Sequence, residues 1–268
     1  MKYALLDTDF ISKAHTVRID DDHHLIDHLI AMPDYLFVCH EQTIKELKRH
    51  NSHAPVWIEE KIKENRIRKY TDNQILNEMS ILYGKIGPYM YTTLLESACG
   101  AFGSTYFNDK YGELGNLDYS AISVEDYLVK LKSIESVIGE GNNLGEIKSY
   151  VLLQWLNSQL ENQLYYFCSD DKNARNGILA LDVINVKCIT LVSSLLRIHK
   201  ETGVGIIEME PYIQAMLDYF TAHDRKTIRV VEASSVGRYM RADCEQVLRE
   251  IFEDKFIELS NGFLKYKS

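Results

Sequence analysis

The sequence predicts an α/β protein with a mainly parallel sheet covered by helices. Short apolar runs occur at about 2–6, 35–38, 164–168 and 186–189. Helix-like stretches separate these runs, and this alternation is typical of parallel sheets. Asp7 directly follows the first run, and Asp170-Asp171 follows the third. Because ligands of open α/β sheets bind beyond the carboxyl ends of the strands, these acids mark a candidate site.

The composition sets limits on the class of protein. The chain has 268 residues and a net charge of −9, which disfavours nonspecific nucleic-acid binding but leaves room for a local basic face or a metal site. Its five cysteines include no CxxC pair, so we expect reduced core residues rather than zinc ligands. No run has the apolar length of a membrane span, and the first residues turn acidic too early for a signal peptide. We therefore expect a cytoplasmic protein with no membrane partner.

Further candidate acids lie at or in two of the helical segments that follow the first two strands. One of Asp7 and Asp9 is expected to cap the helix that begins near residue 10. We do not expect both to be only caps, because Asp7 directly follows the strand. Glu46 lies near the inward face of the helix predicted over 40–50. The alternative for Glu46 is a solvent-exposed pair with Lys45 or Arg49.

Two further segments carry charged or histidine side chains. A helix is expected from about Asp20 to Met32, and His24 and His28 lie four residues apart on it. Without a third nearby ligand, this spacing favours a solvated face over a metal site. The basic segment from Trp57 to Tyr70 is expected to form a helix and then a short strand. It is the best candidate for contacts with phosphates, although most charge runs are simply solvated.

The middle of the chain is predicted to be helical. We expect helix over 73–102, interrupted at Gly87-Pro88, then a long loop over 103–118 and another helix from Ser123 to near Gly139. A further helix opens near Glu146. That residue either complements the helix dipole or presents a carboxylate to a metal.

A boundary is expected at Gly203-Val204-Gly205, which separates a main domain (1–204) from a small module (205–268). The module is predicted to contain helices over 209–223, 233–241 and 243–254, followed by a hairpin turning at Asn261-Gly262. This order resembles a winged helix. Because the helix over 243–254 is mostly acidic, we expect a protein-binding or scaffold role for the module rather than DNA reading.

The dispersed acids are expected to meet at one rim of the sheet. They are Asp7, Glu46, Glu146 and Asp170 or Asp171. Converging carboxylates repel one another unless cations neutralise them, and hard oxygen ligands suit Mg²⁺ or Mn²⁺. Such sites activate water for attack on a phosphodiester. The acids alone leave nuclease and phosphatase open.

Four segments in this order resemble the PIN-domain family of metal-dependent nucleases: YALLDTDFISK, IKEL, LGEIKS and FCSDDKNAR. The resemblance covers about 1–85 and 140–204. It leaves about 86–140 as a helical insertion. The implied fold is an α/β/α PIN-like domain with this insertion and a small α+β, winged-helix-like module.

The resemblance also implies roles for individual residues. Metal ligands for Mg²⁺ or Mn²⁺ would be Asp7, Glu46, Glu146 and Asp170, with Asp171 as a fifth ligand or an orienting group. Thr8 or Asp9 would form hydrogen bonds within the site, and Thr8 would also contact the substrate. Arg175 would contact a substrate phosphate or pin an acid, with a structural salt bridge as the alternative.

We therefore expect a metal-dependent endoribonuclease that acts on RNA, for example as a toxin or defence effector. An antitoxin or another protein is the expected partner, and a homodimer is the expected assembly by analogy with the family. One alternative is a catalytically silent PIN-like scaffold. Another is a phosphatase or DNA nuclease that uses the same acids.

Overall fold

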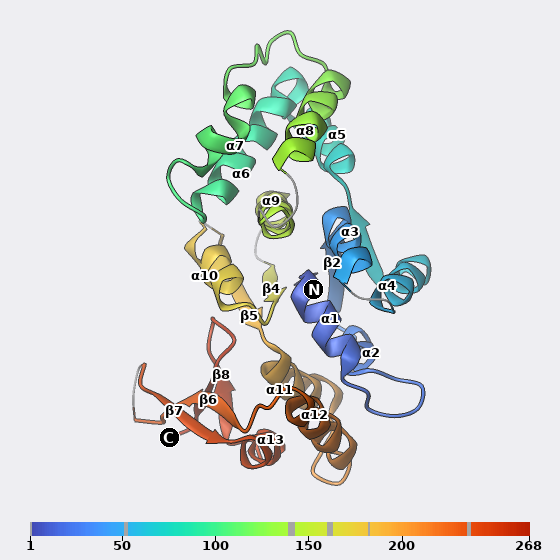
Figure 1. Ribbon diagram of the computed structural model, residues 1–268, viewed down its shortest axis with the longest axis vertical. Helices are drawn as coiled ribbons and strands as arrows, with labels where there is room; N and C mark the ends of the chain where they lie inside the picture. The colour runs from blue at the N-terminus through green and yellow to red at the C-terminus, as the bar shows by residue number, and fades with distance from the viewer. Residues whose placement is uncertain (1, 51–52, 139–142, 160–162, 182, 235–236) are drawn as a thin grey trace.

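A five-stranded, all-parallel sheet in the order β3-β2-β1-β4-β5 forms the centre of the protein (Figure 1). The computed structural model describes residues 2–50, 53–138, 143–159, 163–181, 183–234 and 237–268. The strands are β1 (Lys2–Leu6), β2 (Tyr35–His40), β3 (Ile67–Tyr70), β4 (Leu164–Cys168) and β5 (Val186–Ile189). The predicted parallel α/β architecture is therefore confirmed. Leu6 pairs with Cys168, so the acids after β1 and β4 leave the sheet at the same level.

Alternating side chains of the strands build a separate hydrophobic core on each face of the sheet, as the period of two requires. Ala4 and Leu6 face one core, which is covered by helices α1, α2, α4 and α11. Leu5 and Phe167 face the other, which is covered by α9 and α10. These helices are α1 (Thr8–Thr16), α2 (Leu25–Ile30), α4 (Ala54–Lys63), α9 (Leu144–Gln159), α10 (Lys172–Ala180) and α11 (Leu191–Thr202). A further helix, α3 (Glu41–His50), lies beside α9 at the edge of the sheet. All five cysteines are buried and free.

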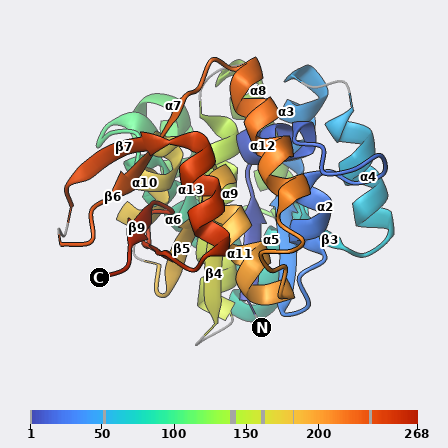
Figure 2. The same cartoon turned by 90° about the horizontal axis from the view of Figure 1, so that it is seen from below.

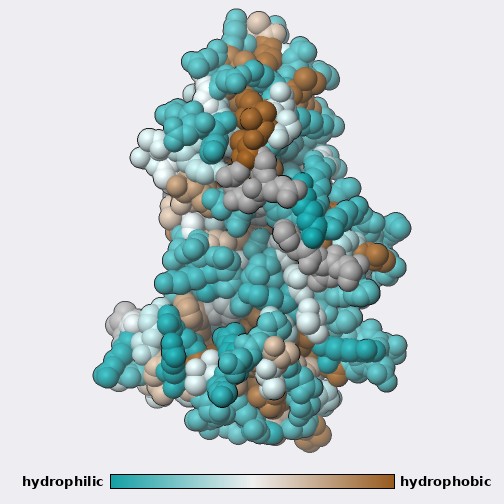
Figure 3. Space-filling view, in the orientation of Figure 1, coloured by the Kyte–Doolittle hydropathy of each residue, from teal (hydrophilic) through white to brown (hydrophobic). Residues whose placement is uncertain are grey.

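A helical extension lies beyond α9, on the face of the sheet that carries Leu5 and Phe167, at the top of Figure 1. It contains α5 (Asp72–Tyr83), the short 3-10 helix η1 (Gly84–Ile86), α6 (Gly87–Gly100), α7 (Tyr106–Gly115) and α8 (Val124–Ile138). The long loop predicted over 103–118 is wrong, because α7 occupies most of it. Phe107, Tyr111 and Leu114 of α7 are buried, at three- and four-residue spacing on one helical face. Apolar side chains also gather on the exterior of this extension in Figure 3.

The C-terminal module consists of two helices and a second, four-stranded sheet in the order β7-β6-β9-β8. Its elements are α12 (Glu210–Ala222), β6 (Thr227–Val231), β7 (Tyr239–Asp243), α13 (Cys244–Phe252), β8 (Phe256–Glu258) and β9 (Leu264–Tyr266). The predicted hairpin is confirmed by the antiparallel pairing of β8 with β9. The helix predicted over 233–241 is wrong, because the end of this segment forms β7 and pairs with β6. Figure 2 shows α11, α12 and α13 side by side on the same side of the molecule.

Candidate functional site

Asp7 lies at the end of β1, where its carboxylate is almost completely buried. It occupies the N-cap position of α1, yet its side chain makes no capping hydrogen bond. Instead, Ser169 Oγ donates to Asp7 Oδ2 over 2.8 Å. Burial raises the pKa of Asp7 to about 7, and the negative charges of Glu146 and Asp9 add to the rise while the bond from Ser169 opposes it. The cap alternative therefore does not account for this carboxylate.

Glu146 lies in the first turn of α9 and faces the same edge of the sheet. Burial raises the pKa of Glu146, and the charges of Glu46, Asp171 and Asp9 raise it further. The structure thus brings acids from β1, α3, α9 and the β4–α10 connection into mutual electrostatic contact. Neither Asp7 nor Glu146 forms an ion pair within the described part of the chain.

Glu46 is held at this edge by two side-chain hydrogen bonds. Thr8 Oγ1 donates to Glu46 Oε2 over 2.9 Å, and Gln42 Nε2 lies 3.4 Å from Oε1. A Cβ atom at Gly145 would lie only 2.3 and 2.6 Å from the two carboxylate oxygens of Glu46. The glycine therefore allows the start of α9 to approach the carboxylate closely, and the positive end of the helix dipole favours that approach.

Asp170 and Asp171 already have protein partners. Asp170 Oδ2 lies 3.3 Å from Lys13 Nζ, and Oδ1 accepts from the backbone N–H of Leu191 over 3.1 Å. Asp171 Oδ1 caps α10 by accepting from the backbone N–H groups of Asn173 and Ala174. Asp171 still acts electrostatically on Glu146, but its capping role is structural.

Arg175 connects the main sheet to the C-terminal hairpin. The side chain is buried, with Nη1 donating to the carbonyl of Ser169 over 2.9 Å and Nε donating to the carbonyl of Asn261 over 3.0 Å. Because its donors serve backbone carbonyls, this arrangement favours a structural tether over a phosphate contact. No ion pair of Arg175 with an acid is present among the described residues.

A buried ion cluster beside the acids was not anticipated from the sequence. Lys148 Nζ lies 2.9 Å from Asp72 Oδ2 and 2.5 Å from Glu135 Oε1, and Tyr91 also bonds to Asp72. His40 Nδ1 accepts from the backbone N–H of Gln42, and Nε2 lies 3.3 Å from Asp72 Oδ1. Burial alone would raise the pKa of Asp72, but Lys148 and His40 outweigh burial and hold it well below its usual range. The sequence offers one sign of this cluster, because Lys148 lies in an otherwise apolar part of the helix α9.

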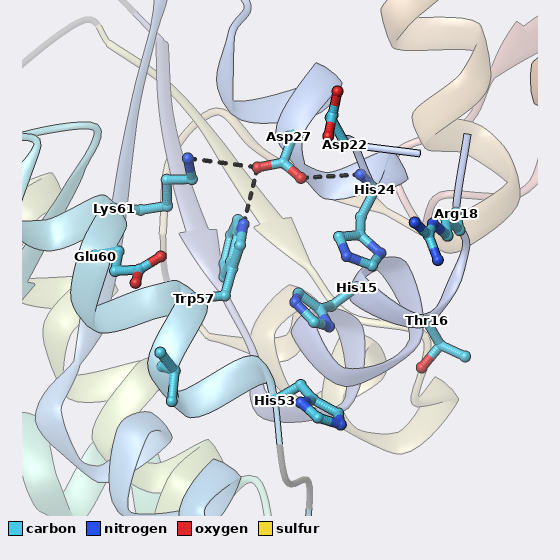
Figure 4. Close-up of a pocket in the computed structure, with 11 residues that line it drawn as sticks. His15, Thr16, Arg18, Asp22, His24, Asp27, His53, Trp57, Glu60 and Lys61 are labelled. Carbon is cyan, nitrogen blue, oxygen red and sulfur yellow. Dashed lines mark hydrogen bonds and ion pairs between the residues drawn. The ribbon is translucent and has the colours of Figure 1, made fainter. Parts of the chain in front are cut away.

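A cavity of about 880 Å³ lies on the other face of the sheet, the face that carries Ala4 and Leu6, between α1, α2 and α4 (Figure 4). His15 and His24 stack there with ring centroids 4.2 Å apart. Trp57 Nε1 donates to Asp27 Oδ1 over 2.8 Å, and Lys61 Nζ lies 3.7 Å from the same oxygen. Burial and the neighbouring His24 lower the pKa of His15 to about 4. None of the predicted metal acids lines this cavity.

The prediction that His24 and His28 lie on a solvated face is wrong, because both side chains are half-buried. The helix α2 begins only at Leu25, and His28 is half-buried with Nδ1 2.9 Å from Tyr212 Oη, so it is not on a solvated face. Ligand atoms of Asp20, His23 and His28 all lie within 4.8 Å of one another. This set of two imidazoles and one carboxylate suits a borderline metal such as Zn²⁺ better than Mg²⁺.

Comparison with protein-family models, with curated proteins and with solved structures finds no match for this chain. No helix in the described ranges is both long and apolar enough to cross a membrane.

Proposed function

We propose that this protein is a Mg²⁺- or Mn²⁺-dependent ribonuclease whose cation is held by carboxylates at the carboxyl edge of the parallel sheet. One observation carries the proposal. Asp7, Glu146 and Glu46 approach one another from three separate elements, and none of them forms an ion pair within the described residues. Asp7 is buried and the two glutamates are half-buried, and like charges placed so without a protein cation are stabilised by protonation or by a cation bound between them.

The donor set fits a hard divalent cation. Among the described residues, no three of the carboxylates at this edge bring oxygens within 4.8 Å of one another. Mg²⁺ commonly takes only one or two protein carboxylates and keeps several waters, so a cation at this edge would be held by one or two of these acids together with water. The residues that would hold the cation are Asp7 and Glu146, with Glu46 nearby. When bound, such a cation supplies an acidified water and stabilises the leaving oxygen of a phosphodiester.

The surrounding residues position these acids. Ser169 fixes the orientation of Asp7, and Thr8 fixes that of Glu46. Lys13 Nζ lies 2.8 Å from Asp9 Oδ2 and 3.3 Å from Asp170 Oδ2. Its single positive charge is therefore shared between two further acids at this edge, and Asp7 and Glu146 stay without an ion pair within the described residues.

The test is cleavage of end-labelled single-stranded RNA by the purified protein with Mn²⁺ and with EDTA. We expect cleavage only with metal, and a loss of about 100-fold or more in Asp7→Asn and Glu146→Gln. Asp109→Asn, which removes an exposed carboxylate on α7, is the matched control and should cleave normally. Cleavage that persists in EDTA, or in both site variants, contradicts the proposal.

A silent scaffold is the second candidate, and the partners of two predicted ligands favour it. Lys13 already neutralises Asp170, and Asp171 caps α10. Under this alternative the acids take up no metal, and a protein partner, such as an antitoxin or a second copy, binds elsewhere. The same acids also serve DNA cleavage, so single-stranded DNA and branched DNA belong beside RNA in the assay.

A further inference from the structure

Helix α13 packs on one face of the C-terminal sheet. Along β6 and β7 the other face is open except at Val231, which is fully buried. Ile228, Val230 and Ala242 are buried on the covered side. Arg229 and Arg241 alternate with them and are exposed on the open side. The two arginines outnumber the one acid on this stretch of the open face, Asp243, so the open face is basic although the protein as a whole carries a net charge of −9.

Arg229 and Arg241 stand directly opposite each other in the antiparallel pairing of β6 with β7. Like charges in this position destabilise a sheet. Neither side chain forms an ion pair within the described residues, whereas Arg249 of α13 binds Glu210 and Glu245. Lys265 extends the face, because it pairs with Val231 in the neighbouring strand and also lacks an ion pair among those residues. An unpaired like-charge arrangement of this kind suits an anionic partner.

Aromatic rings lie among these cations. The guanidinium of Arg229 lies 5.7 Å from the ring centroid of Tyr239, which is exposed on the neighbouring strand. The ring of Phe263 lies 5.1 Å from that of Tyr239. Basic side chains that contact phosphates and exposed rings that stack on bases are the two elements of single-strand recognition.

The open face is continuous with the acid edge. A small cavity of about 110 Å³ is lined by both Arg229 and Asp170, and Phe263 and Arg225 also contribute to it. Arg225 likewise has no ion pair within the described chain, and its guanidinium lies over the ring of Phe220 at 4.7 Å. The cavity therefore joins the open face to Asp170 and gathers three arginines, Arg175, Arg225 and Arg229, around it.

We propose that the open face of this sheet, defined by Arg229, Arg241, Tyr239 and Lys265, binds single-stranded RNA and leads it to the acid edge. The proposal rests on the ribonuclease function for its choice of RNA. It revises the protein-binding role expected from the acidic helix α13, because α13 packs on the opposite side of the sheet.

The test is the binding of a fluorescently labelled single-stranded RNA of about 15 nucleotides, followed by anisotropy in EDTA so that cleavage does not interfere. The double variant Arg229→Gln/Arg241→Gln should bind about tenfold more weakly at low salt. The slope of log K against log salt should fall by about 1.4, because each lost phosphate contact on a single strand contributes about 0.7. Tyr239→Ala should weaken binding at least about fivefold.

The matched control is Lys110→Gln/Lys132→Gln, which removes two exposed lysines from the helical extension. It should bind RNA like the unaltered protein. The arginine variant should melt no lower than the unaltered protein, because it removes a like-charge pair, and this separates lost binding from lost folding.

Unchanged RNA binding by the arginine variant, or equal losses in both double variants, would overturn the proposal; the first result would point to a protein as the occupant. The two proposals fail separately. If RNA binding depends on the arginines but no RNA is cleaved with metal, the ribonuclease function is contradicted and RNA binding by the open face is supported. If cleavage depends on Asp7 but the arginine variant binds RNA normally, only the proposal of RNA binding by the open face is contradicted.

Discussion

Replacing Asp7 by asparagine should stabilise the metal-free protein at pH 8 while abolishing its activity. Burial raises the pKa of this carboxyl from 3.8 to about 7. The native state therefore binds more protons than the unfolded state between these two values, and the free energy of unfolding falls as pH rises through this range. At about 1.36 kcal/mol for each pH unit, the upper bound on the loss is about 4 kcal/mol.

Asparagine removes the charge and retains an oxygen that accepts from Ser169 Oγ. We expect a gain of about 2 kcal/mol at pH 8, or about 4 °C in Tm, and a smaller gain at pH 5, where the native carboxyl is protonated. Thermal unfolding in EDTA at both pH values measures this. Asp170→Asn is the contrast and should destabilise, because Asp170 has Lys13 as a partner. An Asp7→Asn protein that is less stable at pH 8, or equally stabilised at both pH values, would refute the reasoning.

Two other perturbations test the surroundings of the site. Lys148→Met leaves Asp72 and Glu135 buried without their cation, so we expect a loss of about 3–5 kcal/mol in urea unfolding; a loss under 1 kcal/mol would contradict the buried cluster. Gly145→Ala puts a methyl group against the carboxylate of Glu46, so cleavage should fall about tenfold or more. Gly112→Ala, where the added Cβ meets open space within α7, should retain cleavage and gain about 0.5–1 kcal/mol of stability. Equal activity of the two alanine variants would show that Glu46 does not need its present position.

Most of the sheet could be predicted from the sequence because its strands are short apolar runs, and acids follow two of them, β1 and β4. The same rule placed Asp7 and Asp170 at one edge, since carboxyl ends of parallel strands meet there. The roles of the acids as metal ligands stay predictions. What the sequence could not show is that Asp7 makes no side-chain cap while Asp171 does, because the two share the same local pattern.

Other features depended on contacts between distant segments. The segment over 103–118 is rich in turn-forming residues, yet its three buried side chains on one face form α7 against the rest of the extension. The strand β7 lies where a helix was predicted, because pairing with β6 overrides local preference. Lys148 meets Asp72 and Glu135 from two other helices. A lysine in an apolar helical run indicates a buried cation, but no local pattern identifies its partners.

The central claim is that the carboxylates at the sheet edge bind a divalent cation, and a Mn²⁺ titration by calorimetry tests it most directly. The titration should use His23→Ala protein, because Asp20, His23 and His28 form a separate group that could also take up Mn²⁺. We predict binding of Mn²⁺ that disappears when Asp7→Asn and Glu146→Gln are added to this background and persists when Asp109→Asn is added. Equal Mn²⁺ binding with and without the two site substitutions, or no binding in the His23→Ala protein, would contradict the account.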